Sequence, residues 1–155
     1  MTEVRLRNVE DSDIDVFYDN QADPEAAEMA AFPSRDRDVF TAHWAKIRAD
    51  PGPIQRTIVV DGTAVAGNVV SWPQDGQQMV GYWVGREYWG RGVATAALAR
   101  LVEELPIRPL YAHVATHNAG SIRVLEKCGF RRDSAEEAKA PASADGVEEF
   151  IFVLE

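Results

Sequence analysis

The sequence predicts an α/β or α+β domain in which helices cover both faces of a sheet. Residues 82–84 form an apolar strand pattern that passes through a glycine turn into a helical pattern. Two β-rich runs are joined by Asp61-Gly62, which is a strong signal for a two-residue hairpin turn. A later strand pattern, residues 110–114, is followed by a helix that begins at Asn118. Strand–helix–strand units mixed with hairpins are typical of such a sheet.

The N-terminal third predicts an edge strand and three helices. Apolar and basic residues alternate over residues 4–7, as expected of a strand at the sheet edge. Residues 11–13 offer caps for a short helix, and Asp23-Pro24 predicts a second helix that runs through Met29. A longer helix should begin at Asp36 and end at residues 51–53. One face of this helix should carry Val39, Phe40, His43, Trp44 and Ile47.

The rest of the chain predicts a meander and further strand–helix units. Strands are expected over residues 57–60, 63–72 and 79–85, with a turn at 73–76. The helix after the glycine turn has one apolar stripe and ends at Pro106; the stripe comprises Ala94, Ala97, Leu98, Leu101, Val102 and Leu105. The helix from Asn118 should end at Gly129. A strand at 130–133, a mobile loop at 135–146 and a final strand at 147–154 complete the expected order.

Length and composition favour one domain, residues 1–155, with enough chain for a full core. The 25 Asp and Glu residues outnumber the 16 Lys and Arg residues, and the formal charge is −9. This argues against nucleic acid or an anionic membrane as partner, because both need a basic face. We expect a cytoplasmic protein, since no apolar segment resembles a signal peptide or a membrane span. The lone Cys128 excludes an intrachain disulfide, and the histidine spacing predicts no metal site.

The glycine turn predicts an anion site. The first N–H groups of a helix have no partner within the helix, and the helix dipole favours negative charge there. Gly90 and Gly92 lack a Cβ, so a phosphate can approach the backbone and the turn can adopt positive φ. A pair of glycines alone is weak evidence, because it is more often a simple turn. The Walker A pattern is absent, and Thr95 stands where a dinucleotide pattern expects a third glycine or alanine.

Two motifs resemble the GCN5-related N-acetyltransferase (GNAT) superfamily. Residues 89–94, Trp-Gly-Arg-Gly-Val-Ala, are similar to its acyl-CoA signature Gln/Arg-x-x-Gly-x-Gly/Ala, with Trp89 in place of the Gln or Arg. Residues 118–130 resemble the "N-x-x-S…EK-x-GF" segment of the branch that contains the ribosomal-protein N-terminal acetyltransferases. Two ordered motifs at the expected separation are far more specific than either alone, and the resemblance extends over essentially the whole chain.

The resemblance implies a fold, an activity and a co-substrate. The implied GNAT fold is a mixed, mostly antiparallel sheet that splays open at its centre, between the strands at 79–85 and 110–114, with acetyl-CoA in the opening. The implied activity is that of an acyltransferase that moves an acetyl group from acetyl-CoA to a primary amine by direct transfer in a ternary complex. The acceptor would be a small-molecule amine or a peptide N-terminus, with its site shaped by residues 21–37. A homodimer is left open.

The expected cofactor residues come from the turn, the strand before it and the second motif. Backbone N–H groups of the turn would hold the pyrophosphate, and Arg91 and Arg86 either contact phosphate or are simply solvated. The free strand edge at Val84 can pair with the pantetheine amides, and Asn118 can bind the pantetheine arm, cap its helix, or do both. The expected set is Trp83, Val84, Trp89, Gly90, Arg91, Gly92, Val93, Ala94, Thr95, Asn118 and Ser121.

Two residues are expected to act at the thioester. In the family a main-chain N–H of the strand faces the thioester carbonyl, so Val84 is the candidate oxyanion donor. Ser121 either donates a hydrogen bond to the departing sulfur or is only a small residue in the first helical turn. Many relatives carry a tyrosine acid four residues after this serine, where the present chain has Leu125. This difference makes Ser121 the stronger candidate for the donor to the departing sulfur.

The general base is not assigned by the sequence. Family members often place a glutamate on the strand at 79–85, and no carboxylate is present there. Glu28, Asp36 and Asp38 are outside candidates that can equally be solvated or capping residues, and a water chain is a further option. These missing groups motivate the main alternative function, a catalytically silent acyl-CoA-binding module. A nucleotide- or phosphate-binding protein would require the match to both motifs to be a coincidence.

Overall fold

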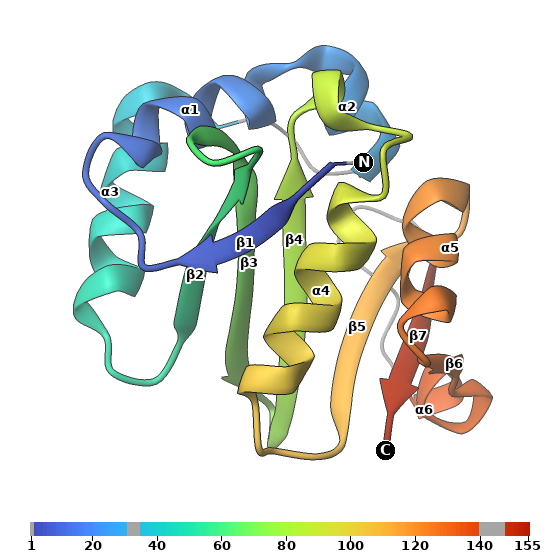
Figure 1. The fold of residues 1–155 in the computed structure, drawn as a ribbon. Coiled ribbons are helices and arrows are strands. Elements are labelled where there is room, and N and C mark those ends of the chain that lie inside the picture. The colour runs from blue at the N-terminus through green and yellow to red at the C-terminus, as the bar shows by residue number, and fades with distance from the viewer. Residues whose placement is uncertain (1, 31–34, 140–147) are drawn as a thin grey trace.

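The computed structural model describes residues 2–30, 35–139 and 148–155, and within them seven strands form one sheet in the order β1-β2-β3-β4-β5-β7-β6 (Figure 1). The strands are β1 (Val4–Arg7), β2 (Ile54–Val60), β3 (Ala64–Gln74), β4 (Gln77–Val84), β5 (Leu110–Ala115), β6 (Arg131–Arg132) and β7 (Glu149–Leu154). The helices are α1 (Asp13–Ala22), α2 (Pro24–Ala30), α3 (Arg37–Ala49), α4 (Val93–Glu104), α5 (Ala119–Lys127) and α6 (Ser134–Lys139), with a 3-10 turn, η1 (Arg86–Tyr88), before α4. In the part of the chain described, no helix has the length and apolar character that a membrane crossing requires.

The sheet opens at its centre, as predicted. β4 and β5 are its parallel pair, and the other paired strands are antiparallel. The β4–β5 pairing is limited to Gln78 with Leu110 and Met79 with Tyr111. Beyond Met79 the two strands diverge, as Figure 1 shows. The second half of β4 therefore has an edge that β5 does not cover.

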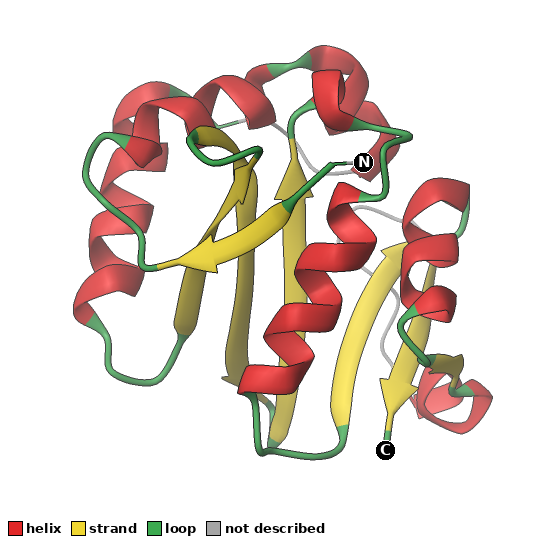
Figure 2. Cartoon of the chain, viewed as in Figure 1, coloured by secondary structure: helices red, strands yellow, loops and turns green. Residues whose placement is uncertain are grey.

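Helices cover both faces of the sheet, which confirms the predicted fold class (Figure 2). Side chains of α4 and α5 form one core cluster with apolar residues of β1 to β5 and β7; the helical members are Val93, Ala97, Leu98, Leu101 and Leu125. A second cluster contains Phe17 of α1 with Phe40 and Trp44 of α3. Successive residues of β3 divide between the clusters, because Ala66 joins the first and Val65 packs against the second. Neighbouring residues of a strand face opposite sides, so the clusters lie on opposite faces.

Both central hairpins turn on an Asp-Gly pair. Asp61 and Gly62 have φ of 50° and 96°, and Asp75 and Gly76 have φ of 52° and 80°. Two consecutive positive φ angles are the geometry of the hairpin turn that matches strand twist. The turn predicted at residues 73–76 was therefore too long. The last two residues before Asp75 pair with Gln78 and Gln77 and belong to β3.

The helix starts at Asp23 and Asp36 are confirmed. The Asp36 carboxylate accepts a hydrogen bond from the Val39 N–H at 2.9 Å, and that of Asp23 accepts one from the Glu25 N–H at 3.0 Å. Of the residues predicted to share one face of α3, Phe40 and Trp44 are buried, whereas Val39 has an exposed fraction of 53%. Phe40 and Trp44, which are one turn apart, are buried in one cluster with Phe17, and the ring centroids of Trp44 and Phe17 are 4.8 Å apart.

The mobile loop predicted for residues 135–146 was wrong in its first part, where α6 runs from Ser134 to Lys139. Asp133 caps this helix, since its carboxylate accepts a hydrogen bond from the Glu136 N–H at 3.0 Å. Asp followed three residues later by Glu is a capping-box pattern that was overlooked. β6 has two residues, fewer than the four predicted, and β7 begins at Glu149. The rest of the predicted loop, and Val147, lie outside the described residues.

Candidate functional site

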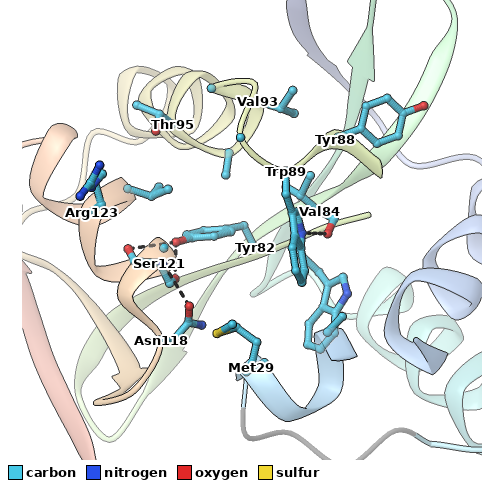
Figure 3. Close-up of a pocket in the computed structure, with 18 of the residues that line it drawn as sticks. Met29, Tyr82, Val84, Tyr88, Trp89, Val93, Thr95, Asn118, Ser121 and Arg123 are labelled. Atoms are coloured by element: carbon cyan, nitrogen blue, oxygen red, sulfur yellow. Dashed lines mark hydrogen bonds between the residues drawn. The ribbon is translucent and has the colours of Figure 1, made fainter. Parts of the chain in front are cut away.

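A cavity of about 480 Å³ lies where β4 and β5 diverge. Its walls come from β4, the turn that follows it, the start of α4, one side of α5, and α2 (Figure 3). The expected cofactor residues, with the exception of Arg91, all line it: Trp83, Val84, Trp89, Gly90, Gly92, Val93, Ala94, Thr95, Asn118 and Ser121. Two stretches that are far apart in the sequence, the glycine turn and the start of α5, thus face one space.

The glycine turn has the conformation that an anion site requires. Gly90 and Gly92 both have φ of 74°, a left-handed backbone that residues with a Cβ rarely adopt. A Cβ built on either glycine would meet open space, so the backbone is uncovered at this point. The first intrahelical bond of α4 runs from the Ala96 N–H to the Gly92 oxygen at 3.1 Å. The N–H groups of the three residues before Ala96 therefore lie at the helix end that faces the turn.

The two arginines near the turn are engaged with carboxylates. Arg91 lies outside the cavity lining, with its guanidinium 3.5 Å from an Asp61 carboxylate oxygen. Arg86 is ion-paired with Asp23 at 2.9 Å and with Glu25, which ties it to the start of α2. Neither arginine is among the residues that line the cavity.

The cationic side chains that do line the cavity, among the described residues, are Arg123 and Lys127 of α5. The sequence reasoning missed both. A signal was available, because Gly120, Arg123 and Lys127 follow one another at spacings of three and four and so share one face of α5. These residues give a basic wall to a cavity in a chain whose formal charge is −9.

The free edge of β4 is partly occupied by the chain itself. The Gly85 N–H bonds to the Ala66 oxygen at 2.8 Å. Ladder bonds alternate along an antiparallel strand, so the N–H and C=O of the preceding residue, Val84, face away from β3 and toward the opening. The Val84 oxygen accepts a hydrogen bond from the Trp89 indole N–H at 2.9 Å. The Trp89 ring consequently stands across the cavity in Figure 3.

Ser121 sits in a hydrogen-bonded group that joins α5 to β4. The Asn118 side-chain oxygen accepts the Ser121 N–H at 3.2 Å, which is the predicted helix cap. A ligand contact from Asn118 would therefore come from its amide nitrogen. The Ser121 hydroxyl is hydrogen-bonded to the hydroxyl of Tyr82, and the phenol also lies 3.3 Å from the Ser121 main-chain oxygen (Figure 3).

Tyr82 is a further site residue that the sequence reasoning missed. It lies two residues before Val84 on β4, so both side chains point to the α4–α5 side of the sheet, a signal that strand alternation provides. Burial raises the pKa of Tyr82 to about 12. The phenol is thus neutral at physiological pH and can donate a hydrogen bond into the cavity.

Two further polar residues, Cys128 and Asp36, have structural contacts. The Cys128 thiol is half-buried and donates to the Thr95 main-chain oxygen at 3.4 Å, and burial raises its pKa, which disfavours a nucleophilic thiolate. Asp36 caps α3 and is not part of the cavity wall. Across the described residues, the lining contains no aspartate or glutamate. A base held by the protein is therefore not visible at this site.

The sheet opening, the left-handed glycine turn and the helix N-terminus define the class of acetyltransferase-like α/β proteins. Residues 3–131 match the family described as the acetyltransferase (GNAT) domain, and the chain belongs to this family. The provisionally named ribosomal N-acetyltransferase YdaF of Bacillus subtilis (strain 168) is 30% identical over 111 residues, which are 67% of this chain and 58% of that protein. The chain spans about half the length of the curated relatives it matches.

Solved structures show the same fold at low sequence identity. The spermidine N-acetyltransferase from Vibrio cholerae, solved with CoA and spermine, gives a TM-score of 0.81 at 14% identity and covers 97% of this chain and 94% of its own. The aminoglycoside acetyltransferase AAC(6')-Ib, solved with coenzyme A, gives a TM-score of 0.79 at 18% identity. The match covers 98% of this chain and 94% of that protein. At these identities the likeness concerns the fold alone.

Proposed function

We propose that this protein is an N-acetyltransferase that uses acetyl-CoA and moves the acetyl group to a primary amine by direct transfer in a ternary complex. The observation that carries the proposal is the cavity at the β4–β5 divergence, where the glycine turn, the Val84 edge and Ser121 face one space. Membership of the GNAT family supports the same reaction class. Direct transfer is consistent with the lone cysteine, because Cys128 does not line the cavity and burial raises the pKa of its thiol.

The residues present suit a CoA thioester. The uncovered backbone at Gly90 and Gly92 and the N-terminus of α4 would hold the pyrophosphate, and Arg123 and Lys127 would face the phosphates from α5. The Val84 main-chain groups would pair with the pantetheine amides. When bound, acetyl-CoA supplies an activated acetyl group.

The chain's own groups would then stabilise charge at the reacting centre. The Val84 N–H lies on the open edge of β4 and is the candidate oxyanion donor. The Ser121 hydroxyl is the candidate donor to the leaving sulfur. Because no carboxylate lines the described cavity wall, we infer that the acceptor loses its proton to water. The rate should then rise with pH toward the pKa of the amine, which is about 10 for an alkylamine.

The acceptor proposed is a small cationic amine or a peptide N-terminus, and the protein would act in the cytoplasm. The acceptor end of the cavity is walled by α2 through Ala26, Met29 and Ala30. The same helix carries Glu28, whose charge would favour a positively charged substrate. Proteins of similar fold are named for spermidine and aminoglycoside acetylation, and YdaF is provisionally named for ribosomal acetylation.

A silent acyl-CoA-binding module is the second candidate, and the carboxylate-free lining of the described cavity is the observation that favours it. CoA-thiol release from acetyl-CoA across polyamines, aminoglycosides, amino acids and short peptides separates the two. Release that depends on an amine would support the enzyme, and the class of amine would identify the acceptor. Acetyl-CoA binding with no release by any amine would support the module.

A further inference from the structure

A phenol and a serine hydroxyl meet across the open part of the sheet. Tyr82 lies three residues beyond Met79, the last residue of β4 that pairs with β5. Its ring reaches from the strand to Ser121 in the first turn of α5, and both residues line the cavity (Figure 3). Building on the proposed function, we propose that Tyr82 is a positioning residue that orients the Ser121 O–H toward the leaving sulfur of the acyl donor.

The donor in this pair is assigned by acidity. Either oxygen of the hydroxyl pair can be the donor by position, but the Tyr82 O–H is directed at Ser121, because it also donates to the Ser121 main-chain oxygen at 3.3 Å. A phenol is a far stronger acid than an aliphatic alcohol, so we take the Tyr82 O–H as the donor shared between the two Ser121 oxygens. Because burial raises the pKa of Tyr82 to about 12, the phenol retains this proton throughout the physiological range. A hydroxyl that accepts one hydrogen bond still has its own proton to donate. With its N–H held by Asn118, Ser121 is fixed in place and only this O–H remains to be directed.

In the proposed acetyl transfer, charge and protons balance if Tyr82 donates a hydrogen bond to Ser121 without giving up its proton. Attack by the acceptor nitrogen forms a C–N bond and breaks the C–S bond, and the electron pair of the broken bond goes to the sulfur. The Ser121 O–H stabilises that negative charge by a hydrogen bond to the sulfur. The hydrogen bond from Tyr82 strengthens the one from Ser121, since linked hydrogen bonds polarise one another. The sulfur is neutralised by the proton that the nitrogen must lose to become an amide. A thiolate, with an ordinary pKa near 8.5, does not deprotonate a phenol of pKa about 12.

In this chain the position where relatives carry a tyrosine, occupied by Leu125, does not supply a side chain to the cavity. Leu125 is 1% exposed and belongs to the core between α5 and the sheet. A side chain at that position of this helix therefore packs inward. Tyr82 supplies a phenol to the same serine from the opposite wall of the opening, which accounts for the absence of a tyrosine on α5.

The first test measures binding, without turnover. The affinity of CoA relative to acetyl-CoA is measured by calorimetry from pH 6.5 to 9.5, because only CoA has an ionisable thiol. If Ser121 and Tyr82 stabilise the thiolate, the pKa of the bound CoA thiol should be lowered. The affinity of CoA relative to that of acetyl-CoA should then increase about tenfold as the pH rises through this lowered pKa. Tyr82→Phe and Ser121→Ala should each remove most of this gain. The titratable neighbours, Cys128, Arg123 and Lys127, are unchanged in every variant and so cancel in the comparison.

The second test uses an amine that the panel identifies. Tyr82→Phe should lower kcat about tenfold and leave KM for acetyl-CoA within about twofold, and the double variant with Ser121→Ala should lose no more than the worse single variant. Tyr18→Phe removes a phenol from the α1–α3 side of the sheet and should match the wild type. Additive losses, or a pH-dependent gain that survives in Tyr82→Phe, would overturn the assignment. CoA binding without turnover would contradict the enzymatic proposal alone, and the binding test would still decide the role of Tyr82.

Discussion

Gly92 shows how one residue can serve both backbone conformation and ligand access. It is the N-cap of α4 with φ of 74°, and a side chain there would stand in the open space of the glycine turn. Gly92→Val should therefore abolish acetyl-CoA binding, because the valine methyls would fill the place expected for the pyrophosphate. The strain of positive φ should also lower the free energy of unfolding by about 1–3 kcal/mol. Binding is measured by calorimetry and stability by urea unfolding.

A matched control separates the strain from the loss of access. Gly76 has φ of 80° in the β3–β4 turn, and a Cβ there also meets open space. Gly76→Val should cost similar stability and leave acetyl-CoA affinity unchanged. Unaltered affinity in a folded Gly92→Val protein would remove the turn from the cofactor site.

Asp13 is a residue whose charge stabilises the fold. Its side chain is 1% exposed and accepts hydrogen bonds from Arg7 at 2.7 Å, from the Thr57 hydroxyl at 2.7 Å and from the Glu10 N–H at 2.8 Å. Burial alone would raise the pKa of Asp13, but these donors together outweigh it and lower the pKa. The carboxylate thus ties β1, α1 and β2 to one another.

The lowered pKa fixes the sign of the pH dependence. A carboxyl with a lower pKa in the folded state adds stability above its unfolded pKa, about 3.9, and this stability is lost as the pH falls through the folded value. Asp13→Asn should lower the free energy of unfolding at pH 7 by about 2–4 kcal/mol, because Arg7 loses its buried partner. Urea unfolding between pH 2.5 and 7 should show the gap between wild type and variant shrinking in acid. A constant gap would mean that packing, not charge, is lost.

At the scale of elements, the turn between β4 and α4 is held to the strand by Trp89. The indole N–H bonds to the Val84 oxygen, the group expected to pair with a pantetheine amide. Trp89→Phe keeps an aromatic ring and removes this competing donor. We expect acetyl-CoA affinity to rise about fivefold, the equivalent of one hydrogen bond near 1 kcal/mol. Calorimetric titration of the variant with acetyl-CoA measures this change.

Trp72→Phe is the matched control for this element. The Trp72 indole N–H donates to the Gln74 side chain at 3.0 Å, away from the cavity lining, so this variant should bind acetyl-CoA like the wild type. Weaker binding in Trp89→Phe would show that the indole belongs to the bound state as part of the wall, and would contradict its role as a competitor for Val84.

Elements were predictable where a local signal determines them. Gly129 ends α5 as predicted, with φ of 91° and the Phe130 N–H bonded to the Leu125 oxygen at 3.0 Å, because only a residue free of a Cβ adopts this geometry easily. The α6 helix was missed because its cap at Asp133 lies in a stretch of small polar residues without apolar periodicity. Helical spacing grouped Val39 with Phe40 and Trp44 on one face of α3, but spacing alone does not decide which of these residues the core covers, and Val39 is exposed.

At the scale of the whole molecule, the site depends on contacts between distant segments. The two motifs located the glycine turn and Ser121, which carry local signatures. The partner of Ser121 is Tyr82, 39 residues away in sequence, and that contact follows from the divergence of β4 from β5. The salt bridges of Arg86 to α2 likewise depend on tertiary packing. No pattern within either motif predicts such pairs, because they form only when the chain packs into its tertiary structure.

The same arrangement predicts how a ligand would change the molecule. A CoA thioester in the opening would contact β4, the start of α4 and the start of α5. Of β4, only Gln78 and Met79 pair with β5, the strand that precedes α5. We expect acetyl-CoA to slow amide hydrogen exchange at residues 82–84, 92–95 and 118–121, because local openings of these segments would require the ligand to leave. The β2–β3 hairpin, which lies away from the cavity, should exchange at an unchanged rate.

Exchange measured by mass spectrometry at saturating acetyl-CoA, with Gly92→Val as the non-binding reference, tests this without any acceptor. Protection confined to one wall would mean that the ligand binds outside the opening. Equal protection of the β2–β3 hairpin would indicate only the general stabilisation that any tight ligand gives, by about 2.7 kcal/mol at a hundredfold excess over Kd. Protection on both walls together would establish that the divergence of β4 and β5 is the binding site, and that the ligand supplies the link between strands that the sheet itself lacks there.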